Sequence, residues 1–163
     1  MNKKFEGILF TLLLILGCIN GYSGEAKGWG TAINGVQLSV NYTNNFIEVG
    51  STTNISVCVT NSSANSVMVF PGNNGGTFKV YITDRSGNTY KISPEMSDPG
   101  IVLAVFPPIF IDPRQSHKWM VSVTVGKDIK PGNYMLKATQ SIYVGRKSFD
   151  ITSNMLPVYI KSD

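Results

Sequence analysis

Side chains that carry acid–base or metal chemistry are scarce in this sequence. It contains one histidine and two cysteines, and charged residues make up only 15% of the chain. Zinc sites need several His or Cys ligands, and an activated nucleophile needs a base beside it. We therefore expect a protein without enzymatic activity, without a metal and without a cofactor.

Surface exposure and turn formation are sufficient to explain the positions of the few titratable residues. His117 lies between Ser116 and Lys118 at the start of an expected strand, and we expect it to face solvent. Five of the ten acidic residues fall in expected turns, where such side chains bond the local backbone. These are Asp84, Glu95, Asp98, Asp112 and Asp128.

No apolar stretch reaches the ~20 residues that a membrane-spanning helix needs. The apolar run Ile8–Leu16 has nine residues and follows two lysines, Lys3 and Lys4. A short apolar run behind a basic N-terminal segment is typical of a secretory signal peptide. We assign residues 1–17 to such a peptide, so the mature protein is expected to be exported.

The end of the apolar run allows two interpretations. The segment Ile15-Leu16-Gly17-Cys18 resembles a bacterial lipobox, in which the cysteine is acylated and becomes the mature N-terminus. Lipoboxes usually have Leu where Ile15 stands and a small residue where Leu16 stands. Ordinary cleavage near Gly21 or Gly24 would instead remove Cys18 and release the protein. We therefore expect either an envelope lipoprotein, with the membrane reached only through its lipid, or a secreted protein.

Cys58 is the only other cysteine, so the fold is expected to form without an intramolecular disulfide. It lies in an alternating segment in which Ile55, Val57 and Val59 share one face and Cys58 the other. The local sequence supplies no group that would lower the thiol pKa. We interpret Cys58 as structural.

Period-two alternation dominates the rest of the chain, while sustained helical periodicity is missing. Alternating apolar residues predict strands at 36–42, 54–59 and 118–125, and at 78–82 and 89–92 around the turn 84–88. A flexible extension is expected over 18–34. Residues 35–163 are expected to form one all-β domain of about seven to nine strands.

The segment Pro131-Gly-Asn-Tyr-Met-Leu136 resembles the tyrosine corner of immunoglobulin-type domains. This resemblance implies an immunoglobulin-like antiparallel β-sandwich in which the Tyr134 hydroxyl bonds to nearby backbone. It also implies that Leu136 stands where antibody domains place their second cysteine. Val57 would then be its neighbour in the opposite sheet, with a van der Waals contact in place of the disulfide.

The stretch from Val36 to Ile160 also resembles exported bacterial Ig-like modules and the intracellular proteinase inhibitor (BsuPI-like) family. The matching segments are Ser56-Val-Cys-Val-Thr-Asn61, Phe78-Lys-Val-Tyr-Ile-Thr-Asp-Arg-Ser-Gly87 and Lys130-Pro-Gly-Asn-Tyr134. These segments describe how a sandwich is built. They imply protease inhibition as an alternative function, although no inhibitory loop can be matched residue by residue.

Pro107 and Pro108 interrupt an apolar segment, and we expect them at a sheet edge, a kink or a crossover. The neighbouring Phe106, Ile109 and Phe110 are expected either in the core or in an exposed contact patch. The leading hypothesis is an exported binding or structural module whose sheet faces or loops contact a protein or a glycan. Basic residues are scattered along the sequence, so nucleic-acid binding is not expected.

The mass of the mature N-terminus distinguishes the two export interpretations. A lipoprotein is expected to begin at Cys18 and to carry the added mass of its acyl chains. Mass spectrometry of the protein purified from its host checks this expectation. A free amine at residue 19 or later would eliminate the lipid anchor.

Overall fold

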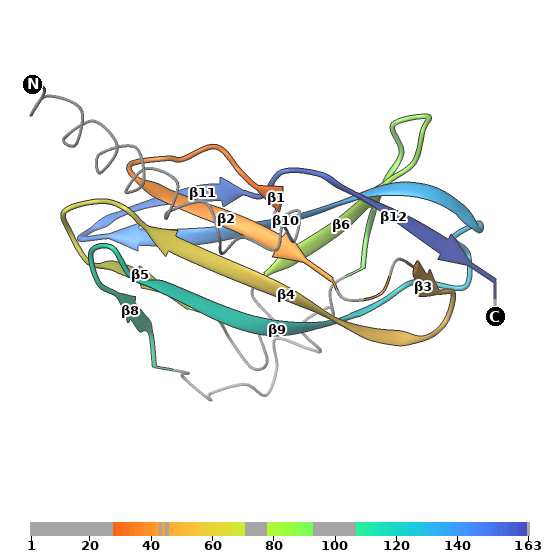
Figure 1. Cartoon of the computed structure of the whole chain (residues 1–163), viewed down its shortest axis with the longest axis horizontal. Helices are drawn as coiled ribbons and strands as arrows, with labels where there is room; N and C mark the ends of the chain where they lie inside the picture. The colour runs from red at the N-terminus through yellow and green to blue at the C-terminus, as the bar shows by residue number, and fades with distance from the viewer. Residues whose placement is uncertain (1–27, 43, 45, 71–77, 93–106, 163) are drawn as a thin grey trace, which may run out of the picture.

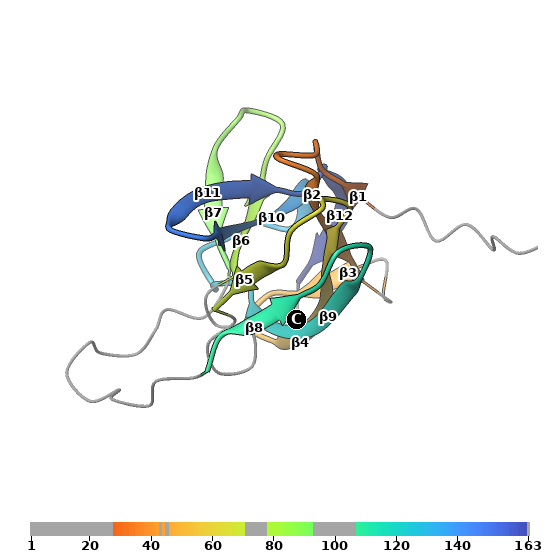
Figure 2. The same cartoon turned by 90° about the vertical axis from the view of Figure 1, so that its left-hand side faces the viewer.

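The computed structural model describes residues 28–42, 44, 46–70, 78–92 and 107–162. Every regular element among them is a β-strand, and the strands form two sheets. The smaller sheet has the order β1 (Gly28–Trp29), β2 (Val36–Asn41), β4 (Thr52–Asn61) and β9 (Ser116–Thr124). Figures 1 and 2 show the two sheets as the layers of a sandwich.

The larger sheet has eight strands, and most of them pair with one long strand, β10 (Gly132–Val144). Along one path the order is β3 (Phe46–Glu48), β12 (Leu156–Lys161), β10, β5 (Val67–Val69) and β8 (Ile109–Ile111). The strands β11 (Lys147–Thr152) and β6 (Lys79–Thr83) also pair with β10, and β7 (Thr89–Lys91) pairs with β6. All these pairs are antiparallel except β3 with β12, which is parallel.

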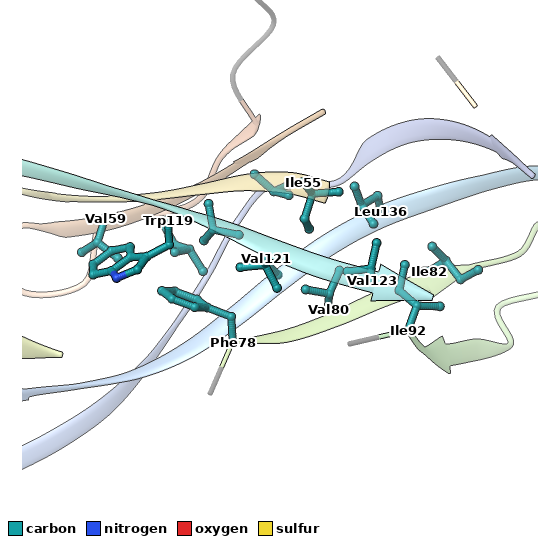
Figure 3. Packing of buried hydrophobic residues seen from close by; sticks show 14 of the residues in the cluster. Ile55, Val59, Phe78, Val80, Ile82, Ile92, Trp119, Val121, Val123 and Leu136 are labelled. Atoms are coloured by element: carbon teal, nitrogen blue, oxygen red, sulfur yellow. The ribbon is translucent and has the colours of Figure 1, made fainter. Parts of the chain in front are cut away.

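The core lies between the sheets and is built from the alternating apolar residues. In β4 the side chains of Ile55, Val57 and Val59 are fully buried, and Val121 and Val123 lie beside them on β9 of the same sheet. Phe78 contributes from the other sheet, with its ring 5.2 Å from that of Trp119. Figure 3 shows Ile55, Trp119 and Val121 of one layer with Phe78, Val80 and Leu136 of the other between the two sheets. Burial of this apolar surface is the main favourable term in folding.

The strands predicted at 36–42, 54–59 and 118–125 are present as β2, β4 and β9, and the predicted hairpin around 84–88 joins β6 to β7. The structure adds β11, which was not predicted, and the strand that holds the tyrosine motif, β10, continues to Val144. In β11 two of the six residues, Phe149 and Ile151, carry the apolar signal, which is too short to stand out. The part of the apolar segment that precedes Pro107 lies outside the described residues.

The four-stranded sheet begins earlier than expected. Its first strand, β1, lies within residues 18–34, which were predicted to be a flexible extension. Gly28 and Trp29 pair with Val40 and Ser39 of β2. The connecting turn has Asn34 and Gly35 at positive φ, 51° and 78°. Asn-Gly at two left-handed positions is the usual sequence of a tight hairpin turn. The strand was missed because two residues are too few to show alternation.

Tyr134 has the geometry expected of a tyrosine corner. Its hydroxyl donates a hydrogen bond of 2.7 Å to the carbonyl oxygen of Lys130, and the side chain is 7% exposed. Leu136 and Val57 are both fully buried in the core, one from each sheet. The fold is an immunoglobulin-like β-sandwich. Among the described residues there is no helix with the length and hydropathy to cross a membrane.

Replacing Tyr134 by Phe removes the hydrogen bond and keeps the buried ring. We expect Tyr134→Phe to lower the free energy of unfolding by about 0.5–1.5 kcal/mol, the net value of one such bond. Urea unfolding followed by circular dichroism measures the change. Tyr159→Phe, at a side chain that is 46% exposed, is the control and should cost under about 0.5 kcal/mol. Equal losses in the two variants would contradict a role for the corner.

Candidate functional site

The outer face of the four-stranded sheet carries mainly polar side chains, several of which bond to one another, and one exposed methionine, Met120. Hydroxyls of Thr52 and Thr124 lie 2.8 Å apart, and Ser122 donates to the side-chain oxygen of Asn54 at 2.9 Å. Cys58 is half-buried on the same face. Side chains that satisfy their hydrogen bonds locally leave few groups for a partner, so the other sheet is the better candidate for a binding face.

The outer face of the eight-stranded sheet is different, because it carries exposed aromatic and methionine side chains. Phe46, Met135, Tyr159 and Phe110 are between 38% and 64% exposed. They belong to β3, β10, β12 and β8 and alternate with residues that are buried in the core. Exposed apolar side chains gathered on one face are typical of interaction sites.

Part of this face is hollowed into a groove of about 590 Å³, which we name the Tyr159 groove. Apolar side chains form most of its surface, and Asn133, Asp84 and Arg85 supply polar groups. One wall is held in place by Tyr42, whose hydroxyl donates to the carbonyl oxygen of Pro157. The residues that line it are Tyr42, Thr83, Asp84, Arg85, Asn133, Tyr134, Met135, Pro157, Val158 and Tyr159.

The hairpin loop between β6 and β7 positions Arg85 at the rim of the groove. The Asp84 carboxylate accepts hydrogen bonds from the backbone N–H groups of Ser86 and Asn88, at 2.8 and 2.9 Å. The Asn88 side chain donates a further bond of 2.8 Å. This side-chain bond, followed by the backbone bonds, lowers the pKa of Asp84 below its ordinary value of 3.8. Arg85 itself is exposed and makes no ion pair with any described residue.

A chain of tyrosines connects this loop to the interior. The Tyr90 hydroxyl lies 3.4 Å from the Asp84 carboxylate, and its ring meets the ring of Tyr134 edge-on at 6.2 Å. Burial raises the pKa of Tyr134, and the neighbouring Tyr90 and Asp84 raise it further. Burial likewise raises the pKa of Tyr42 on the opposite side of the groove. The phenols therefore stay neutral at physiological pH and act as hydrogen-bond donors.

Beside the groove, pairing of the strands brings three lysines together. Tyr81 in β6 has Lys137 of β10 as its cross-strand partner on one side and Lys91 of β7 on the other. Lys79, two residues from Tyr81, is on the same face. We call Lys79, Lys91 and Lys137 the lysine cluster. These lysines were expected to be isolated charges, because they are far apart along the chain.

Some residues of the predicted contact patch around Pro107, Pro108 and Phe110 are exposed, and others are buried. Pro107 is exposed and Pro108 half-buried, directly before the edge strand β8. Phe110 is 64% exposed and lies beside Met68 of β5, whereas Ile111 is buried. Asn61, fully buried, donates to the carbonyl oxygen of Ile111 at 2.9 Å and ties β8 to β4. The contact patch is therefore open at Phe110, and Phe106 lies outside the described residues.

The other singled-out residues do not join this site. His117 is exposed at the start of β9, with its ring 4.3 Å from that of Trp119. Among the described residues, no three His, Cys, Asp or Glu side chains gather where they could hold a metal ion. Cys18 and the signal peptide lie outside the described residues, so both stay predictions.

Comparison with known proteins gives the fold and no family. No protein-family model matches the chain, and no curated protein matches its sequence. The C-terminal domain of wzt is similar in structure, with a TM-score of 0.50 at 11% identity over 86% of this chain and 81% of that chain. At this identity the likeness shows the β-sandwich alone.

Two further solved structures resemble the chain more loosely. The ASH/PapD-like domain 7 of human CEP192 has 10% identity and a TM-score of 0.33 over 88% of this chain and 93% of that chain. The yjhA protein from Bacillus subtilis has 11% identity and a TM-score of 0.39 over 83% of this chain and 97% of that chain.

The lowered pKa of Asp84 predicts a pH-dependent contribution to stability. A carboxylate with a depressed pKa in the folded state stabilises the protein above the pKa of the unfolded state, and this effect is lost as the pH falls through the folded pKa. We expect Asp84→Asn to lower the melting temperature at neutral pH, and the difference from the wild type to vanish in acid. Thermal unfolding measured across this pH range tests the expectation. Asp112→Asn changes the net charge equally and is the control; the same pH dependence in both variants would contradict a specific role of the loop.

Proposed function

We propose that this protein is an exported immunoglobulin-like binding module without catalytic activity, anchored through an acylated Cys18 or released. It holds a protein or glycan partner of the cell surface on the outer face of its eight-stranded sheet. The signal-peptide pattern before Cys18 supports export. The immunoglobulin-like fold supports a role as a scaffold for contacts, although a fold alone does not define a function.

The observation that carries this proposal is the difference between the two outer faces. On the four-stranded sheet, hydroxyl and amide side chains bond to one another across the strands. On the eight-stranded sheet, the apolar side chains of Phe46, Met135 and Tyr159 are exposed to solvent, whereas the apolar residues next to them along the strands are buried in the core. Exposing such side chains to water is unfavourable, and a partner that covers them would recover that free energy.

The composition around the Tyr159 groove fits the proposal. Tyrosine, phenylalanine, methionine and arginine are the residues enriched at the centres of binding interfaces. Tyr159, Met135 and Arg85 combine this composition with a concave surface. Arg85 has no ion-pair partner among the described residues, so its guanidinium can bond to a carboxylate or a hydroxyl of the bound molecule.

The resemblance to the proteinase inhibitor family supports inhibition as an alternative activity of the same module. That alternative rests on segments that build the sandwich, namely residues 56–61, 78–87 and 130–134. No feature of the described surface favours it over a general binding role, so the binding module is our conclusion.

Two methionines, one on each outer face, provide a matched test. Met135 lines the Tyr159 groove and Met120 lies on the four-stranded sheet, 38% and 52% exposed. We expect Met135→Ser and Tyr159→Ser to lower the amount of partner that co-purifies with the full chain from native envelopes by about fivefold or more, as for central interface residues. Met120→Ser should leave it unchanged. Equal losses with Met120→Ser, or no loss with the groove variants, would overturn the proposed surface.

A further inference from the structure

The lysine cluster forms a positive patch across β7, β6 and β10 on the outer face of the eight-stranded sheet. Lys91, Tyr81 and Lys137 stand in one row across β7, β6 and β10. Neighbouring strands are about 4.8 Å apart, so the outer two backbone positions are separated by roughly 10 Å. Lys79 is diagonal to Lys137, because its cross-strand partner is Thr139. Three ammonium groups can therefore reach a single bound molecule.

The carboxylates on this face are engaged with other groups. Glu48 pairs with Lys161 at 2.5 Å, the only ion pair among the described residues. Asp150 accepts a hydrogen bond of 2.5 Å from Ser141, and Asp84 is bonded within its own loop. None of the three lysines has an ion-pair partner among the described residues, and like charges on neighbouring strands are unfavourable until an anion approaches.

An aromatic ring lies among these charges. The Lys137 ammonium is 5.8 Å from the centre of the Tyr81 ring, and Tyr81 is half-buried between its two lysine neighbours. Tyrosine offers an apolar ring surface together with a polar hydroxyl. An aromatic ring beside cations suits a ligand that combines apolar faces with negative groups.

The surface continues from the lysine cluster into the Tyr159 groove. Thr83 follows Tyr81 by two residues on the same face, and Met135 precedes Lys137 by two. Both line the groove, at about 7 Å along the strands from the row of Tyr81. A long molecule lying along the strands would contact the lysines and Tyr81 first and then Arg85, Asn133 and Tyr159.

We propose that the lysine cluster and Tyr81 bind an acidic polysaccharide, whose carboxylate or phosphate groups contact the lysines while its sugar rings pack against the exposed part of Tyr81. This inference rests on the proposed function and names the class of partner. The lysine cluster and Tyr81 lie beside the Tyr159 groove and are not among the residues that line it. Protein hot spots are usually packed in such pockets, whereas an extended polymer with repeated charges needs only a flat charged strip.

The test measures binding of the purified full chain to four polymers by isothermal titration calorimetry at low salt. They are polygalacturonate, phosphorylated dextran, neutral dextran and polyglutamate. We expect at least one of the two acidic polysaccharides to bind more tightly than polyglutamate at equal charge, and neutral dextran not to bind. Replacing Lys79, Lys91 and Lys137 together by Gln should weaken this binding about tenfold, the sum of three exposed charge contacts.

Two further variants separate site binding from general charge attraction. Lys118, Lys127 and Lys147, replaced together by Gln, remove the same charge elsewhere and should change the affinity less than about twofold. Tyr81→Ser should weaken binding of the acidic polysaccharide and leave polyglutamate unaffected. Circular dichroism and melting temperature verify that each variant is folded.

The inference is overturned if polyglutamate binds as tightly as both polysaccharides, if neither polysaccharide binds, or if the two triple variants behave alike. Its failure is distinguishable from failure of the proposed function. If the lysine variant keeps its polymer binding while Met135→Ser still loses its envelope partner, only the polysaccharide inference falls. If Met135→Ser and Met120→Ser also behave alike, the proposed binding face falls as well.

Discussion

The pairing of β10 is the constraint on which the rest of this structure depends. One edge of the strand pairs first with β12 and then with β11, and the other edge pairs with β6 and then with β5. Its inward residues, among them Tyr134, Leu136 and Ile142, are buried in the core. The outward residues between them form the centre of the proposed binding face. Because successive side chains of a strand point to opposite sides, one sequence encodes both surfaces.

Alternation explains how much of the fold was predictable from the sequence. Long half-buried strands such as β4 and β9 repeat the pattern often enough to be recognised, and the tyrosine motif at 131–136 indicated the class of sandwich. Short strands carry too few alternations, as β1 and β11 show. The Asn34-Gly35 pair was a usable signal for the first hairpin.

The candidate site was less accessible to sequence reasoning, because it depends on which strands become neighbours. Lys79, Lys91 and Lys137 are scattered along the chain, and only the register of β6 with β7 and β10 places them around Tyr81. The same holds for Phe46 and Tyr159, which are paired across the parallel strands β3 and β12. Phe110 could be identified as a candidate, but its exposure could not be decided without its partner Met68.

Register therefore connects stability with function in this protein. A shift of β6 by one residue would turn Tyr81 and Lys79 inward and bring the buried Val80 and Ile82 to the surface, at a large cost in apolar burial. The core thus holds the binding face in place without contacting a ligand. Substitutions confined to the outward positions can change the partner while the inward residues keep the fold. A sandwich of this kind can acquire a new binding specificity without a new core.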